Sequence, residues 1–221
     1  GFKIEFHKFI KIEGVPGREF RKDKVHILEH TAVIFTSRKA VDHFFRIANE
    51  LRIEVPDDMK YFCISEATAY YLQKYVQYRK RKIFHGKQNF FHLLEIIKKH
   101  KNETFLLPCS DIHKQTFPEL LKENGIKFNK AIIYKTLASD LSAVDINKYD
   151  MLIFFSPSGV SSLFKNFPEF KQDSKLIAAF GPSTAKAIKN AGLELNISAP
   201  TKTAPSMTMA IEQYLNNNKK K

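Results

Sequence analysis

The chain contains one pair of motifs twice, in the same order. Residues 34–41 read IFTSRKAV and residues 153–160 read IFFSPSGV. The first copy is followed by YFCISEATA at 61–69 and the second by IAAFGPSTA at 177–185, at nearly the same offset. Each motif is an apolar, strand-like run that leads through small residues into a helical pattern. The chain is therefore predicted to hold two related units, each with two strand-to-helix turns.

Apolar and β-branched runs of strand length recur along the whole chain. Helically spaced apolar residues, such as Ala40, Phe44 and Ala48, separate most of these runs. Alternating strands and helices need crossover connections, which produce mostly parallel sheets covered on both faces. The predicted fold class is α/β, with strands at Ile4–Ile12, Ala32–Thr36, Tyr61–Ile64, Lys82–Phe84, Phe105–Pro108, Ala131–Thr136, Met151–Phe155, Leu176–Phe180 and Leu195–Ser198.

The N-terminal segment FKIEFHKFIKI has no evident partner strand in the first unit, so we expect it to pair with the C-terminal unit. One domain is then discontinuous, formed by residues 1–8 plus 139–221. It carries the other domain, residues 14–133, as an insertion. The two crossings, 9–13 and 134–138, form the connector. A chain of 221 residues is long enough for two such domains.

Composition narrows the class of partner. The formal net charge of +13 favours an anionic ligand, because a basic surface attracts anions. The sequence has neither an apolar run of about 18 residues nor a charged-then-apolar leader, so we expect a cytoplasmic protein without a membrane partner. Cys63 and Cys109 lie in apolar runs without metal-ligand spacing and are expected to be buried, reduced thiols.

The four repeated turns place hydroxyl residues where helices begin. In open α/β sheets, ligands bind beyond the carboxyl ends of the strands, where helix N-termini carry unpaired N–H groups. Plain N-capping is the favoured interpretation of any one of these residues. Four such turns in two units favour an anion site, since capping alone does not require the pattern to be duplicated.

Four features occur together in this chain: IFTSRKAVDHFF, IFFSPSGVSSLF, IAAFGPSTAKAIKNAGL followed by SAPT, and the tyrosine of AIIYKT. Their combination resembles the uroporphyrinogen-III synthase family. The similarity runs over nearly the whole chain and rests on the order and spacing of loosely patterned motifs. It implies two similar α/β domains with mostly parallel sheets, joined by a two-stranded connector, with the active-site cleft between them.

The resemblance also implies the chemistry. The substrate is hydroxymethylbilane, a linear polycarboxylate, which the enzyme cyclises to uroporphyrinogen III with loss of water and inversion of ring D through a spiro intermediate. No metal or organic cofactor is implied, and we expect a monomer. Tyr134 is the candidate proton donor. The candidate substrate-binding residues are Thr36, Ser37, Arg38, Ser65, Thr68, Ser110, Lys114, Ser156, Ser158, Gly159, Gly181, Ser183 and Thr184.

The sequence departs from the family pattern in several places. A strand and helix of the type VLVTRP precedes Phe2 in family members and is missing from the printed sequence. Ser65 replaces a frequent glycine, while Ser110 and Lys114 stand where many members have glycine and arginine. Gly159 and Gly181 correspond to Ala40 and Ser65 in the first unit, so we expect the C-terminal unit to allow the closer backbone approach to substrate.

Two further signals carry other interpretations. His26–His30 matches the H-x-x-E-H zinc string, but a helix end is favoured over a metal site. The run Tyr78–Lys82 is favoured as a solvated basic rim over a nucleic-acid patch. A two-lobed binding protein for an anionic small molecule and a basic nucleic-acid-binding α/β protein remain the alternative functions.

Overall fold

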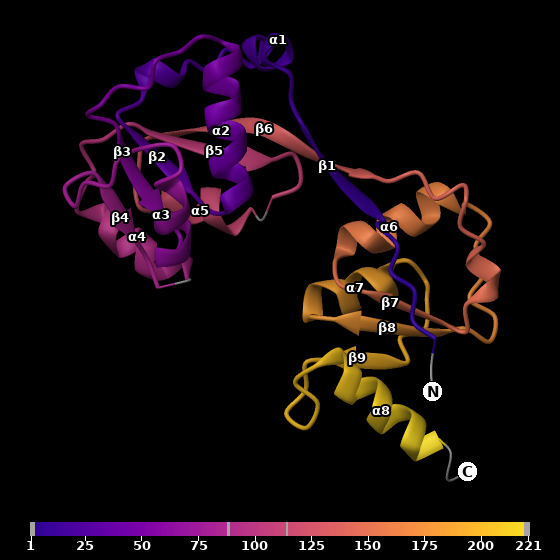
Figure 1. Cartoon of the computed structure of the whole chain (residues 1–221). Helices are drawn as coiled ribbons and strands as arrows, with labels where there is room; N and C mark the ends of the chain where they lie inside the picture. Colours follow the sequence, from indigo (N-terminus) through magenta and orange to yellow (C-terminus); the bar gives the residue numbers. More distant parts are fainter. Residues whose placement is uncertain (1–2, 88, 114, 219–221) are drawn as a thin grey trace. The chain divides into compact units, whose positions relative to one another are not determined.

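The computed structural model describes residues 3–87, 89–113 and 115–218. The chain divides into two compact units. We call Ile12–Thr136 the inner unit, and Gly1–Lys11 with Leu137–Lys221 the outer unit. Two segments join them, and these contain the neighbouring strands β1 (Ile10–Gly14) and β6 (Phe128–Ala138). Both views show these strands side by side where the chain passes between the units (Figure 1).

The inner unit is built on a six-stranded sheet with the order β1-β6-β5-β2-β3-β4. The pairs β6-β5, β5-β2, β2-β3 and β3-β4 are all parallel, as the strand–helix alternation predicts. A bulge between Cys109 and Ser110 shifts the register so that Ser110 lies opposite Tyr134. The remaining strands are β2 (Ala32–Phe35), β3 (Lys60–Cys63), β4 (Ile83–His85) and β5 (Phe105–Ser110).

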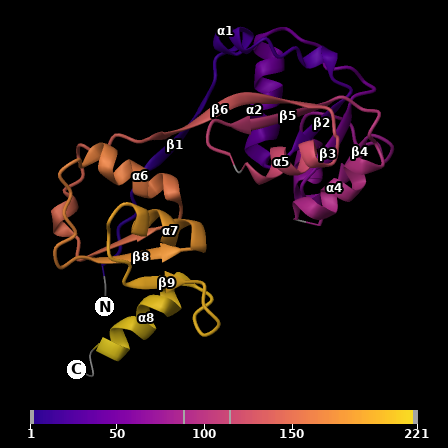
Figure 2. The same cartoon turned by 180° about the vertical axis from the view of Figure 1, so that it is seen from behind.

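Helices cover both faces of this sheet because its central strands are apolar on both sides. Val33 and Phe35 of β2 pack on one face with α2 and α3, and Ala32 and Ile34 pack on the other with α4 and α5. Figure 2 shows the helices around the sheet from behind. Their bounds are α1 (Gly17–Phe20), α2 (Arg38–Glu50), α3 (Glu66–Leu72), α4 (Phe90–Lys98) and α5 (Thr116–Glu123).

The outer unit repeats this plan on a smaller scale. Its three strands are parallel in the order β7-β8-β9, with α6 and α7 against one face and α8 against the other. The bounds are β7 (Met151–Phe154), α6 (Pro157–Asn166), β8 (Leu176–Phe180), α7 (Pro182–Asn190), β9 (Ile197–Ala199) and α8 (Met207–Asn218).

The predicted strand Ile4–Ile12 is wrong at its start. The strand begins at Ile10, and residues 3–9 form no strand, with Phe6 90% exposed. Phe9 belongs to the outer unit, where its carbonyl accepts hydrogen bonds from the Ser139 N–H and the Ser162 hydroxyl. A segment with apolar alternation forms a strand only where the edge of a neighbouring strand is available for hydrogen bonding. Among the described residues, no strand pairs with residues 3–9.

The H-x-x-E-H motif, His26–His30, contains a single 3-10 turn, Ile27–Glu29, and is not the end of an α-helix. His30 is buried, and its Nδ1 lies 2.8 Å from the His26 carbonyl oxygen while its Nε2 lies 3.0 Å from the Asn129 amide nitrogen. Both ring nitrogens therefore have structural partners. Within the described ranges, no group of three or more His, Cys, Asp or Glu residues has the geometry to hold a metal.

The two thiols are free and buried, as the sequence predicts. Burial raises the pKa of Cys63 to about 12 and that of Cys109 to about 11, so both stay protonated at neutral pH. No helix in the described part of the chain has the length and apolarity needed to cross a lipid bilayer.

Candidate active site

Tyr134 lies in β6 and faces the start of α2. Its ring is stacked on that of His43, with centroids 5.0 Å apart and planes 22° from parallel. Burial is the main cause of a raised pKa for the Tyr134 hydroxyl, while an interaction with the Ser37 side chain opposes that shift. A phenol with a raised pKa is fully protonated at neutral pH and can donate a proton.

Arg46, one helical turn beyond His43, fixes the imidazole beneath Tyr134. The Arg46 Nε–H donates to His43 Nδ1 at 3.1 Å, so the neutral ring carries its proton on Nε2. The same guanidinium donates to the carbonyl oxygens of Val15 and Ile133, at 2.8 and 3.1 Å. Burial, and secondarily the Arg46 charge, lowers the pKa of His43. The sequence reasoning missed both residues, although their spacing of three places them on one face of α2.

Ser110 ends β5 beside Tyr134 and is buried. Its hydroxyl donates to Asp111 Oδ1 at 2.7 Å, and the backbone N–H groups of Ile112 and Thr136 donate to the same oxygen. These hydrogen bonds outweigh the effect of burial and lower the pKa of Asp111. Ser110 therefore anchors a rigid carboxylate next to β6. The candidate Lys114 lies outside the described residues.

The other inner-unit candidates lie at the turns after β2 and β3. The Ser37 hydroxyl caps α2 by accepting from the Ala40 N–H at 3.1 Å. Ser65 and Thr68 are buried, and their hydroxyls are hydrogen-bonded to each other. The Ser65 hydroxyl also accepts a hydrogen bond from the Thr68 N–H. The Arg38 guanidinium lies 5.5 Å from the centre of the Tyr71 ring and is exposed. Thr36 is half-buried between β2 and Ser37.

In the outer unit, a serine of the turn after β7 caps the helix that follows it. The Ser156 hydroxyl accepts from the Gly159 N–H at 3.1 Å, Pro157 opens α6, and Ser158 is half-buried. Gly159 itself is buried, and a Cβ atom built there meets Phe154 at 3.4 Å and Ser156 Oγ at 3.6 Å. Its missing Cβ thus faces the interior of the unit, so the close backbone approach expected at this glycine has no support from its geometry.

The turn after β8 differs from the other three. Gly181 has φ +87°, and its position as the cap of α7 gives the helix no side-chain acceptor. Pro182 has no N–H, so the backbone N–H groups of Ser183 and Thr184 are the first ones at this terminus. The Ser183 side chain is exposed and that of Thr184 is buried. An uncapped helix start with an exposed hydroxyl is suited to a carboxylate.

The candidates therefore form two local groups, one in each unit. Ser37, Ser110 and Tyr134 lie at the carboxyl edge of adjacent strands in the inner unit, and the Gly181 turn lies at the corresponding edge of the outer unit. In each of Ser37, Ser65 and Ser156 the hydroxyl oxygen accepts a backbone N–H at the start of the following helix. These groups can donate a proton and bind carboxylates, which suits acid-assisted loss of a leaving group from a polyanion.

Comparison with known proteins gives one family. The profile described as "Uroporphyrinogen-III synthase HemD" matches residues 2–209. A uroporphyrinogen-III synthase of Chlorobaculum parvum is 29% identical over 123 residues, which is 52% of this chain and 50% of that protein. The match thus spans half the length of this curated relative.

Two solved structures share the fold. Uroporphyrinogen-III synthetase from Helicobacter pylori is 20% identical, with a TM-score of 0.61 over 95% of this chain and 91% of that one. A mutant uroporphyrinogen III synthase from Thermus thermophilus is 16% identical, with a TM-score of 0.56 over 95% and 88% of the two chains. These likenesses confirm the predicted α/β class.

Proposed function

Because the family profile covers residues 2–209, the chain belongs to the uroporphyrinogen-III synthase family, and we propose that it cyclises hydroxymethylbilane to uroporphyrinogen III. The observation that carries this proposal is a protonated, partly buried Tyr134 beside Ser37, at the turn of the family motif IFTSRKAV, and beside Ser110. We further propose that the protein works as a cytoplasmic monomer without a cofactor.

In the proposed reaction, Tyr134 donates its proton to the terminal hydroxyl of the bilane. The carbon–oxygen bond breaks, water leaves, and the electron pair of the pyrrole nitrogen stabilises the resulting azafulvene. The substituted carbon of ring D attacks this carbon to form the spiro intermediate. In that intermediate the bond between the substituted carbon of ring D and its original bridging methylene breaks, and the unsubstituted α-carbon of ring D then bonds to that methylene. Ring D is thereby inverted, and the proton lost from this α-carbon restores the phenol.

Carboxylate binding at the turns holds the bilane in the conformation that inverts. We assign the leading role to the Gly181 turn, since its helix has no side-chain cap and Ser183 is exposed. We assign to Ser37 and Ser156 mainly the shaping of their turns, where their hydroxyl oxygens accept the capping N–H groups and their O–H groups stay available as donors. Orientation of this kind can contribute up to about 7–11 kcal/mol to a reaction barrier.

The test is an isomer assay. Bilane made enzymatically is supplied to the protein, and the product is oxidised and separated into type I and type III porphyrins. The proposal expects type III well above the spontaneous type I background. If only type I forms, while the bilane still binds, the chain is a binding protein for an anionic small molecule and the cyclase proposal is wrong.

A further inference from the structure

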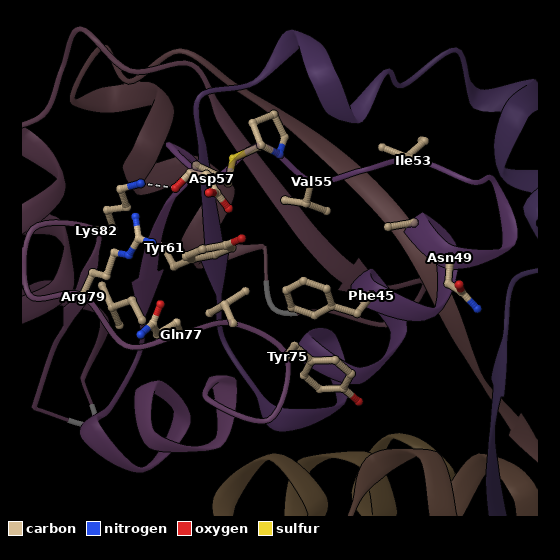
Figure 3. A pocket seen from close by; sticks show the side chains of 15 residues that line it. Phe45, Asn49, Ile53, Val55, Asp57, Tyr61, Tyr75, Gln77, Arg79 and Lys82 are labelled. Atoms are coloured by element: carbon tan, nitrogen blue, oxygen red, sulfur yellow. Dashed lines mark hydrogen bonds between the residues drawn. The ribbon is translucent and has the colours of Figure 1, made fainter.

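A pocket of about 540 Å³ opens in the inner unit at the amino-terminal ends of β3 and β4. It is lined by the second half of α2, by residues 53–59 and by residues 75–83 (Figure 3). Ser37 and Ser65 follow the carboxyl ends of β2 and β3, so the pocket lies at the opposite edge of the sheet from the turns. Its volume falls within the range of about 300–1,000 Å³ typical of small-molecule sites.

The walls of this pocket are planar and held in place. Phe45 and Tyr75 are stacked, with centroids 4.6 Å apart and planes 3° from parallel. The Tyr75 hydroxyl donates a hydrogen bond to Asp42 at 2.8 Å, and this bond fixes the orientation of the Tyr75 ring. Tyr61 provides a further aromatic wall, 6.4 Å from Phe45 between centroids. Flat, rigid aromatic walls fit a planar aromatic ligand.

The Tyr61 hydroxyl has no hydrogen-bond partner among the described residues, although the residue is only 5% exposed. Figure 3 shows this hydroxyl directed into the pocket, toward the space between Val55 and Phe45. Burial and the nearby charge of Asp57 both raise the pKa of Tyr61, so the hydroxyl stays protonated. A hydroxyl that borders the pocket without a protein partner can donate a hydrogen bond to an acceptor on a ligand.

Two cations lie on the rim. Arg79 and Lys82 come from the basic run Tyr78–Lys82, which the proposed cyclisation does not use. The Lys82 ammonium donates to the Asp57 backbone carbonyl, drawn as a dashed line in Figure 3, and so holds the segment 53–59 over the pocket. Arg79 forms no ion pair with any acid in the part of the chain that the structure describes. Two cations against the single Asp57 carboxylate favour an anion.

We propose that this pocket binds a planar aromatic anion that carries a second hydrogen-bond acceptor. The aromatic body packs against Phe45 and Tyr75, the acceptor accepts a hydrogen bond from the Tyr61 hydroxyl, and the anionic group faces Arg79. The site is separate from the proposed active site and does not depend on the cyclase function.

The test is calorimetric titration of the full chain with quinoline-6-carboxylate, which has a ring-nitrogen acceptor, and with 2-naphthoate, which lacks one. Tyr61→Phe keeps the wall and removes the donor. It should weaken quinoline-6-carboxylate binding about tenfold and leave 2-naphthoate binding unchanged. Tyr70→Phe is the matched control, since Tyr70 is 75% exposed and does not line the pocket.

Arg79→Gln tests the anion contact independently. It should weaken both carboxylates about fivefold in low salt and less in high salt, whereas Arg81→Gln, in the same run but outside the pocket lining, should not. The proposal is overturned if neither probe binds below millimolar concentration. It is also overturned if Tyr61→Phe, with an unchanged melting temperature, binds quinoline-6-carboxylate as tightly as the parent protein.

Discussion

The imidazole of His43 lies nearly parallel to the phenol of Tyr134, with ring centroids 5.0 Å apart. Two elements meet in this contact, because His43 belongs to α2 and Tyr134 to β6. Arg46 holds the imidazole through Nδ1 and is itself tied to the carbonyls of Val15 and Ile133. The proposed proton donor is therefore supported by a neutral, oriented ring on a rigid helix.

Replacing Tyr134 by phenylalanine removes the proposed acid and keeps the ring that packs on His43. We expect kcat to fall by about 10²-fold or more, since general acid catalysis contributes roughly 10²–10⁴-fold, with residual turnover from substrate orientation. Steady-state rates and the ratio of type III to type I product measure the effect. Tyr70→Phe, at an exposed position, is the control. Full rate and full isomer selectivity in Tyr134→Phe contradict the assignment.

The pH dependence of turnover tests the same residue. The pKa of Tyr134 is raised above the ordinary value of about 10. The protonated phenol is the active form. Deprotonation of Tyr134 should therefore lower the turnover rate only above about pH 10, and the rate should not change with pH near neutrality on account of this residue. A limb between pH 7 and pH 9 that disappears in Tyr134→Phe is the opposing result.

Protonation of His43 should make the folded protein less stable as the pH is lowered. Its pKa is lowered in the folded protein, so between the folded and unfolded pKa values the unfolded chain binds more protons. The stabilisation from neutral His43 is present above about pH 6.5 and is lost as the pH falls. We expect the loss of melting temperature between pH 7 and pH 5.5 to be smaller in His43→Gln. His100, whose pKa is also lowered, remains in both proteins, so the difference isolates His43.

The turn positions were predictable from sequence, because an apolar run followed by Ser and a helical pattern sets both the strand end and the N-cap. Ser37, Ser65 and Ser156 all cap helices as the plain interpretation predicts. The stacking of His43 on Tyr134 was not predictable. It depends on the β5–β6 register, which includes a bulge, and on the rotation of α2 against that strand.

The N-terminal segment shows the reverse error. Its alternation of apolar and polar residues is a clear strand pattern, yet only Ile10–Gly14 forms a strand. Periodicity describes how a segment would present its faces, whereas strand formation also requires a free edge that supplies hydrogen bonds. The sequence contains no direct signal for that second condition.

Two serines should separate capping from substrate binding. Ser156→Ala removes the acceptor for the Gly159 N–H and should lower the free energy of unfolding by about 1 kcal/mol. Ser183 is exposed and follows Pro182 in an uncapped turn, so Ser183→Ala should leave stability unchanged and raise KM. Urea denaturation and steady-state kinetics measure the two effects. Equal losses of stability in both variants go against this division.

Gly159 and Gly181 of the outer unit form the sharpest pair of tests. Gly181 has φ +87°, a conformation that residues with a side chain rarely adopt, so Gly181→Ala should cost about 1–3 kcal/mol of unfolding free energy and raise KM by distorting the start of α7. Gly159 lies inside α6, and an added Cβ makes only ordinary contacts with Phe154 and Ser156. Gly159→Ala should therefore be neutral or stabilising by up to about 1 kcal/mol.

Urea denaturation and KM for the bilane are measured on both variants and on the parent chain. A large rise in KM for Gly159→Ala, without loss of stability, means that the backbone of α6 contacts substrate more closely than its buried position indicates. Unchanged stability and KM in Gly181→Ala remove the basis for assigning the main carboxylate contact to the turn after β8.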